Sequence, residues 1–315
     1  MKHVVITGGL GFIGHHLAYK YLESNCQVTI IDNLLSQYRN GKLIKYRIES
    51  LNPLANRCTY LQHDCCEEIN LMSRLKENKP DVIINLASYA NQAAVAVHPA
   101  DATRSMPSNA LIIAQIAKRF NCQLIHISSS MVYGNFETCH VDETSVLKPT
   151  NLYGILKLHS EELVRHILPS TVIIRPSAVY GPGDSADRVL AKWIKAALRD
   201  ETINVHGPSN LLDFTYVKDL VDGIVKIESK QLEGKTFNVT RGQAKSLGEA
   251  AVLIKDYTNS LSSINYLDTD KDMPTRGALD ITQASIYSNY SPKMNLEEGL
   301  KVYINWMKNH LDLYE

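Results

Sequence analysis

Apolar runs and amphipathic stretches alternate along the first half of this chain. Short apolar runs predict strands near residues 3–7, 27–31, 58–62, 81–86, 122–127 and 171–175. Between them, apolar positions recur at intervals of three and four residues, which predicts helices near 12–25, 67–78, 98–120 and 151–168. The alternation is typical of a parallel sheet covered by helices on both faces, so we predict a doubly wound α/β fold. Ligands of such sheets bind beyond the carboxyl ends of the strands.

The pattern becomes irregular after Pro176, where glycine–proline pairs and a polar stretch from Asp268 to Arg276 interrupt it. We expect residues 1–176 to form the sheet domain and residues 210–240 to return to it with one more helix and strand. Residues 177–209 and 241–315 are expected to form a smaller, discontinuous C-terminal lobe. A final helix near 295–310 has Leu296, Leu300, Ile304 and Met307 at helical spacing, which most simply indicates packing.

The first predicted strand runs directly into Gly8-Gly9-Leu10-Gly11-Phe12-Ile13-Gly14. A strand, a sharp turn and the free amides of a helix N-terminus together form a site for a pyrophosphate. Gly8 permits the turn, Gly11 lets the phosphates approach the main chain, and Gly14 brings the helix close to the strand. This junction predicts a Rossmann-type domain that binds a dinucleotide.

Two acidic residues follow the next strands. Asp32 ends the second strand, at about the ~20-residue distance expected for the acid that binds the adenosine ribose. A carboxylate there would repel the extra phosphate of NADP, so Asp32 predicts NAD as the cofactor; the simpler alternative is a turn or capping aspartate. Asp64, after the third strand, fits a contact to the adenine and fits a solvated loop acid equally well.

Composition excludes several other classes of function. The 315 residues contain 33 Lys and Arg against 33 Asp and Glu, so nothing indicates a nucleic-acid-binding surface or a basic membrane patch. No apolar stretch is long enough to cross a bilayer, and Met1-Lys2-His3 leads straight into a strand, so we expect a cytoplasmic protein. The six cysteines have no zinc-binding spacing, and we expect thiols and no metal site. Cys139-His140 lies near the expected site, although an exposed loop pair is the simpler interpretation.

Tyr153 and Lys157 stand four residues apart in a predicted helix, which places both side chains on one face. An ammonium beside a phenol favours the phenolate and lowers a pKa that is ~10 when unperturbed. Tyr153 would then act as a base near neutral pH. With 16 tyrosines in the chain, this spacing also arises by accident.

Three serines strengthen the catalytic interpretation. Ser128, Ser129 and Ser130 follow a predicted strand at its carboxyl end, in a chain that already carries a dinucleotide motif. A turn or a helix cap is the structural alternative for such a cluster. Pro149 marks a loop immediately before the helix of Tyr153.

Together these motifs resemble the extended short-chain dehydrogenase/reductase family, and within it the NAD-dependent nucleotide-sugar epimerases and dehydratases. The resemblance covers nearly the whole chain and is strongest to the UDP-glucose 4-epimerase-like members. It includes Thr7–Gly14, Asp32, Leu86-Ala87, Ser128–Gly134, Tyr153–Lys157, Arg175-Pro176, Val179–Gly183, Phe214–Asp219, Arg276–Asp280 and Leu296–Gly299.

The family's functional residues map onto matching positions of this sequence. The resemblance implies that Ser129 is the catalytic hydroxyl, Tyr153 the acid/base, and Lys157 the residue that holds the nicotinamide ribose. It further implies cofactor contacts from Gly8, Gly11, Phe12, Ile13, Gly14, Asp32, Asn33, Asp64, Leu86, Ala87, Ser88, Tyr153, Lys157 and Pro176. Substrate contacts are expected from Ser129, Ser130, Arg188 and Arg276, of which Arg276 matches an arginine that grips the substrate diphosphate; a surface arginine is the alternative. Asn109 is implied to lie near the site.

The residues after Ser129 bear on the reaction. Dehydratases of this group carry Asp-Glu immediately after the catalytic Ser or Thr, whereas this chain has Ser130 and Met131. The resemblance therefore implies an epimerase that inverts one carbon of a nucleotide-diphosphate sugar, most often carbon 4, through a keto intermediate. A keto-sugar reductase, dehydrogenase or dehydratase of the same family is the alternative, followed by a non-catalytic nucleotide-binding protein.

Three positions depart from the uridine-sugar epimerases. Leu212 replaces an arginine before Asp213-Phe214, Ala178 replaces an asparagine, and Gly-Thr is missing after Asn109. The sequence therefore leaves the identity of the substrate's nucleotide undecided. Relatives dimerise through the two helices near 98–120 and 151–168, which implies a homodimer. Leu111, Ile112, Gln115 and Ile116 suit that seam or the protein's own sheet equally.

Overall fold

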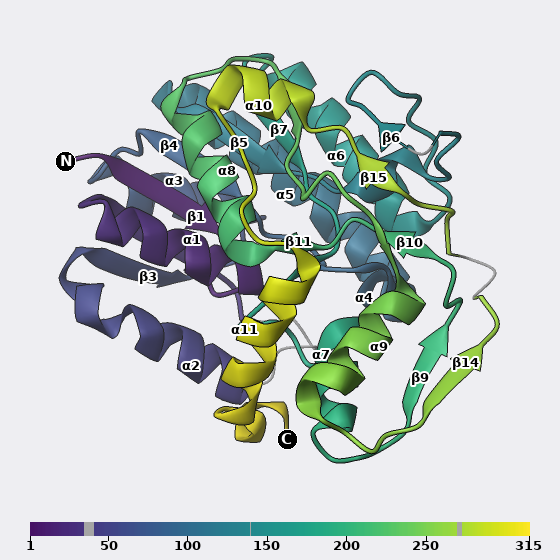
Figure 1. Cartoon of the computed structure of the whole chain (residues 1–315). Coiled ribbons are helices and arrows are strands. Elements are labelled where there is room, and N and C mark those ends of the chain that lie inside the picture. The colour runs from purple at the N-terminus through teal and green to yellow at the C-terminus, as the bar shows by residue number, and fades with distance from the viewer. Residues whose placement is uncertain (35–40, 139, 270–272) are drawn as a thin grey trace.

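A seven-stranded parallel sheet forms the centre of the computed structural model, which describes residues 1–34, 41–138, 140–269 and 273–315. Its strand order is β12-β7-β5-β4-β1-β2-β3 (Figure 1). The strands are β1 (His3–Thr7), β2 (Gln27–Asp32), β3 (Cys58–Gln62), β4 (Val82–Asn85), β5 (Gln123–Ile127), β7 (Val172–Arg175) and β12 (Thr236–Asn238). The predicted α/β fold is confirmed, because six of these strands match the predicted runs and helices flank the sheet.

Helices cover both faces of the sheet. Alternate residues of a strand point to opposite faces, so Val4 and Ile6 of β1 enter one apolar core and Val5 enters the other. The first core includes residues of α1 (Phe12–Glu23), α8 (Val217–Ser229) and α10 (Thr282–Ser288). The second includes residues of α3 (Glu68–Lys76), α5 (Pro99–Phe120) and α6 (Leu152–Ile167). Ile116 of α5 lies in this second core and is fully buried, whereas Leu111, Ile112 and Gln115 are half-buried. The homodimer stays a prediction.

Two α-helices in the described part of residues 1–176 were not predicted from the sequence. The α2 helix (Gly41–Leu51) follows β2 and buries Leu43, Arg47 and Leu51. The α4 helix (Gln92–Val97) is short and begins at Asn91, whose side chain accepts a hydrogen bond from the Ala94 amide at 2.8 Å.

A separate apolar core lies beside the sheet, among α7 (Val189–Ala197), α9 (Leu247–Thr258) and α11 (Leu296–Lys308). In Figure 1 the yellow α11 and the green α9 lie below the sheet in this view. The stripe predicted on the last helix is confirmed as packing, because Leu296, Leu300, Ile304 and Met307 are all buried in this core. The domain boundaries at residues 176, 210 and 240 stay a prediction.

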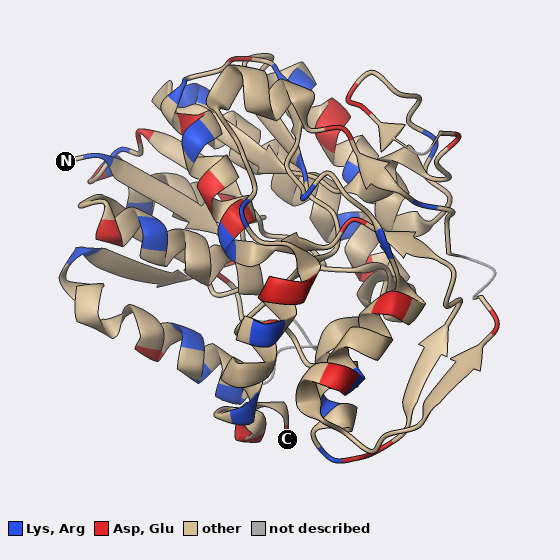
Figure 2. Ribbon diagram, in the orientation of Figure 1, with Lys and Arg blue, Asp and Glu red and all other residues tan. Residues whose placement is uncertain are grey.

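Short elements complete the chain. Within the described residues, four strand pairs lie outside the main sheet: β8 (Val179–Tyr180) with β11 (Thr215–Tyr216), β9 (Ile203–His206) with β14 (Ile264–Leu267), β10 (Leu211–Leu212) with β13 (Lys245–Ser246), and β6 (His140–Val141) with β15 (Ala278–Leu279). Three 3₁₀ turns are η1 (Asn52–Arg57), η2 (Ser130–Tyr133) and η3 (Leu311–Tyr314). Figure 2 shows charges of both signs interspersed over the visible ribbon. Of the helices in the described ranges, none has the length and apolar character to span a bilayer.

Candidate active site

The glycine loop between β1 and α1 has the tight geometry that the sequence predicts. Gly8 has a φ of +64°, and a Cβ there would lie 2.9 Å from the Ala87 amide nitrogen. A Cβ on Gly14 would collide with the Gly8 carbonyl oxygen, so only glycine lets α1 start this close to the loop. Gly11 is the N-cap of α1, and no side chain caps that helix. Backbone amides therefore remain to receive an anion at this end.

Asp32 lies at the carboxyl end of β2, directly beside the glycine loop. Its buried carboxylate accepts hydrogen bonds from the Leu10 amide at 3.1 Å and the Leu34 amide at 3.0 Å. Asn33 donates to the Asp64 carboxylate at 3.1 Å, which ties the ends of β2 and β3 together. A carboxylate held beside a helix N-terminus that would bind phosphate is the arrangement that suits the adenosine half of a dinucleotide.

The loop after β4 lies against the glycine loop and is held by a polar chain that the sequence did not reveal. The Thr7 hydroxyl donates to the Asn85 side-chain oxygen at 2.6 Å and accepts from the Ala87 amide at 3.2 Å. The Asn109 side chain donates to the Ala87 carbonyl oxygen. These bonds fix the Leu86–Ser88 segment that is predicted to contact the cofactor. Asn109 thus lies at the predicted site.

Ser129, Tyr153 and Lys157 meet where α6 packs on η2. The Ser129 hydroxyl caps η2 by accepting from the Met131 amide at 3.2 Å, and it also hydrogen-bonds the Tyr153 hydroxyl. A Cβ on Gly154 would lie 2.6 Å from the Met131 carbonyl oxygen, so this glycine lets α6 approach the serine turn. The Lys157 Nζ lies 5.9 Å from the centroid of the Tyr153 ring and donates to the Ile127 carbonyl at 3.0 Å. The structure therefore brings the three predicted catalytic residues together.

Burial dominates the protonation of these groups. Burial raises the pKa of Tyr153 above its usual value, and the hydrogen bond with Ser129 and the charges of Arg188 and Arg276 oppose it. Burial lowers the pKa of Lys157 to about 8, opposed by Glu161. The expectation that Lys157 lowers the pKa of Tyr153 is wrong for the protein alone. The positive charges that act on this phenol are the two guanidiniums.

Arg276 is half-buried, and its guanidinium points to two buried serines. Its Nη2 donates to the Ser177 hydroxyl at 2.8 Å and to the Ser130 hydroxyl, and both serines are buried. Burial lowers the pKa of Arg276 to about 10; Asp213 opposes that shift and the charge of Arg188 adds to it. Arg188 is the half-buried N-cap of α7. Two guanidiniums this close to Tyr153 form a site that favours an anion.

Met131 forms part of an apolar wall around Tyr153. It is 9% exposed and clusters with Tyr153, Met106, Leu156 and Val95. The groups that shift the pKa of Tyr153 are a hydroxyl and two cations, and no carboxylate is among these described residues. Met131, on this side of the phenol, supplies neither an acid nor a base.

The remaining predicted residues surround this centre. The Pro176 carbonyl, after β7, accepts the Ser130 amide at 2.9 Å and fixes the serine turn. Phe12 and Ile13 start α1 and are half-buried, and Ser88 donates to the Tyr89 carbonyl at 3.0 Å. Cys139 lies outside the described residues. His140 is exposed in β6, where it pairs with Ala278.

A buried ion pair below Lys157 was missed by sequence reasoning. Arg175 donates through Nε to Glu161 Oε1 at 2.9 Å and through Nη2 to Glu161 Oε2 at 2.6 Å. Its Nη1 donates to the Tyr133 hydroxyl at 3.0 Å. Glu161 follows Lys157 by four residues on α6, so both side chains lie on one face of the helix. This spacing was the signal in the sequence that could have placed Glu161 near the site.

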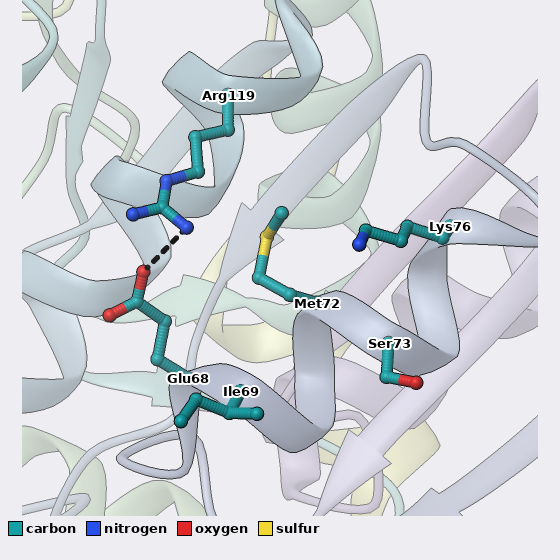
Figure 3. Close-up of a pocket in the computed structure, with 6 residues that line it drawn as sticks. All are labelled: Glu68, Ile69, Met72, Ser73, Lys76 and Arg119. Carbon is teal, nitrogen blue, oxygen red and sulfur yellow. Dashed lines mark ion pairs between the residues drawn. The ribbon is translucent and has the colours of Figure 1, made fainter.

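A hollow of about 360 Å³ lies elsewhere, between α3 and α5 (Figure 3). Figure 3 shows the Glu68–Arg119 ion pair, 3.4 Å long, on one side of the hollow and Lys76 on the other. None of its lining residues is among the predicted site residues. Within the described residues, no group of three or more metal-ligating side chains is close enough to hold a metal ion.

Comparisons with known proteins agree with this geometry. The profile of the NAD dependent epimerase/dehydratase family matches residues 4–240. The chain is 31% identical to the uncharacterized protein MJ1055 of Methanocaldococcus jannaschii, over 99% of this chain and 98% of that protein. It is 27% identical to UDP-glucuronic acid decarboxylase 1 of Danio rerio, over 99% of this chain and 74% of the relative. A crystal structure of UDP-glucuronic acid 4-epimerase from Bacillus cereus, in complex with UDP-glucuronic acid and NAD, superposes with a TM-score of 0.90 at 26% identity, covering 98% and 99% of the two chains.

Proposed function

Because this chain belongs to the NAD-dependent epimerase/dehydratase family, we propose that it is a nucleotide-sugar epimerase that inverts one sugar carbon, carbon 4, through a transient keto intermediate. The cofactor is NAD. The proposed substrate is a nucleotide-diphosphate sugar, the class of ligand bound by the Bacillus cereus enzyme.

The geometry at the ends of the first two strands supports the residues proposed to hold NAD. The amides at the start of α1 would bind the pyrophosphate, and Asp32 would bind the adenosine ribose hydroxyls. The chemistry supplied by bound NAD is the removal and return of a hydride. Lys157, beside Tyr153, would bind the nicotinamide ribose.

Tyr153 is the acid/base of the proposed reaction. Its phenolate takes the proton of a sugar hydroxyl as the carbon is oxidised, and its phenol returns a proton when the carbon is reduced. Ser129, hydrogen-bonded to the phenol, would align the same sugar hydroxyl. Burial raises the pKa of Tyr153, so the positive charges around it are needed to make the base available near neutral pH.

The observation that carries the proposal is the buried Met131 beside Tyr153. Eliminating water next to the new ketone requires an acid and a base, and a thioether supplies neither. Without elimination, the keto sugar turns over in the pocket and receives the hydride on its other face. Arg188 and Arg276 would hold the diphosphate during that rotation, because guanidiniums bind phosphate oxygens through a fixed fork of donors.

The test is to incubate the protein with a panel of nucleotide sugars and a catalytic amount of NAD. Proton magnetic resonance follows the sugar, and absorbance at the nicotinamide band follows the cofactor. We expect one pair of epimers to interconvert with no net change in absorbance. Consumption of NAD in proportion to product indicates a dehydrogenase, and a new deoxy-keto sugar indicates a dehydratase; either result overturns the proposal. Tyr153→Phe is the control, in which NAD binding persists and turnover is lost.

A further inference from the structure

The turn that carries Arg188 is anchored through three consecutive backbone carbonyls. The ring Nε2 of His16, on α1, lies 2.9 Å from the Pro182 carbonyl oxygen. Arg47, on α2, donates through Nη2 to the Gly183 carbonyl at 2.8 Å. Tyr314, at the end of the chain, donates to the Asp184 carbonyl at 2.8 Å. Elements from three distant parts of the sequence therefore fix this turn.

The second terminal nitrogen of the Arg47 guanidinium binds the glycine loop. Its Nη1 donates to the Leu10 carbonyl at 3.0 Å, and the side chain is only 3% exposed. A guanidinium is planar and its donors keep fixed directions, so the two bonds set the spacing between Leu10 and Gly183. Leu10 also donates its amide to Asp32. One buried side chain therefore connects the loop that surrounds NAD to the turn that leads to Arg188.

A further contact closes the other end of the turn. Asn91, which caps α4, donates to the Asp187 carboxylate at 2.9 Å. Asp187 immediately precedes Arg188, so the arginine is held between the Arg47 contact and the β4–α4 loop. That loop also carries the predicted cofactor contacts Leu86, Ala87 and Ser88. Both ends of the turn are thus fastened to elements of the cofactor site.

We infer that Arg47 is a positioning residue that couples occupancy of the NAD site to binding of the substrate diphosphate. It bonds the carbonyls of Leu10 and Gly183 and thereby sets where Arg188 lies relative to the glycine loop. This inference rests on the proposed function, because Arg188 is assigned there to the diphosphate. Such a coupling is reciprocal: bound nucleotide increases retention of NAD by the same factor by which NAD increases nucleotide affinity, and losing Arg47 weakens both effects.

The test compares Arg47→Met and Arg47→Lys with Arg57→Met. Arg57 is a matched control, since it too donates to a backbone carbonyl, that of Leu22 on α1 at 2.9 Å, but it does not reach the turn. NAD-loaded proteins are titrated calorimetrically with uridine, thymidine and guanosine diphosphates, and retained NAD is measured after gel filtration with and without the diphosphate. We expect Arg47→Met to weaken diphosphate binding about tenfold, a size typical of coupling between two sites. Arg47→Lys should weaken it similarly, because an ammonium cannot span two carbonyls.

Thermal unfolding separates positioning from stability. A purely structural role lowers the melting temperature of Arg47→Met and Arg57→Met while leaving diphosphate affinity and NAD retention unchanged, and this result overturns the inference. Full rescue by Arg47→Lys also overturns it. If the wild type binds no diphosphate, the role of Arg188 fails and the inference fails with it. If the wild type binds a diphosphate and Arg47 variants weaken it, but no sugar is epimerised, the inference stands and the proposed function fails.

Discussion

Glu161 and Arg175 form a bidentate ion pair in which both side chains are almost fully buried, 2% and 3% exposed. The carboxylate lies one helical turn beyond Lys157 and raises the pKa of that lysine against the effect of burial. This ion pair in the interior of the sheet domain therefore affects the protonation of Lys157 in the site. A surface ion pair contributes little to the free energy of unfolding, whereas the loss of one member of this buried pair is expected to destabilise the protein.

We predict that Glu161→Gln lowers the free energy of unfolding by about 3–5 kcal/mol, because Arg175 then remains charged and buried without its partner. Urea unfolding monitors this loss. The same change removes a contribution that raises the pKa of Lys157, so a limb of the pH–rate profile that reports Lys157 near pH 8 moves to lower pH. Glu162→Gln, at the exposed neighbouring position, is the control. A stable Glu161→Gln protein with an unshifted profile contradicts both expectations.

Tyr153→Phe tests the acid/base directly. General acid–base catalysis contributes about 10²–10⁴-fold to a rate, so turnover should fall by a factor of at least about 100. The ring still fills the apolar wall with Met131, and the melting temperature should change little. NAD titration and sugar analysis on the same preparation make the comparison. Retention of more than a tenth of the wild-type rate is incompatible with the assigned role.

The sequence predicts the elements that depend on local patterns. Apolar runs located the six strands, and glycine spacing located the loop around Gly8 and Gly14, because these signals lie within a few neighbouring residues. Contacts between distant residues leave no such signal. Arg47 binds Gly183, 136 positions away, through a backbone carbonyl that any residue supplies.

The protonation of the site also required the structure. The spacing of Tyr153 and Lys157 correctly indicated that they lie together, and it gave the wrong cause for the pKa of the phenol. Burial depends on how α6, η2 and the arginines pack around the ring, which a spacing of four residues does not report. For the same reason, the sequence left Arg276 undecided between a surface position and the site.

Arg276→Lys should raise the KM for the nucleotide sugar with a smaller change in kcat. Lysine keeps the charge but loses the planar guanidinium, whose Nη2 binds both Ser130 and Ser177 and whose other donors would bind the diphosphate. Losing a hydrogen bond to a charged group costs about 1.5–3 kcal/mol, which corresponds to roughly 10- to 150-fold in affinity. Steady-state kinetics on the interconverted sugar pair measures the effect. Arg119→Lys, on the exposed arginine of the hollow in Figure 3, should leave both constants unchanged; equal effects from the two variants argue against a site for Arg276.

Asp184 makes stability depend on pH. Burial raises its pKa from 3.8 to about 7, so the folded protein holds a proton that the unfolded chain has released. Between pH 4 and 7 the folded state binds more protons at this residue, and its contribution to stability therefore falls as the pH rises. Asp184→Asn removes the ionisation, and its melting temperature relative to wild type should increase through this range and level off above pH 7. Asp222→Asn, at the surface beside Lys20, controls for the loss of one negative charge. A constant difference between Asp184→Asn and wild type from pH 5 to 8 would show that the Asp184 carboxyl is ionised throughout that range.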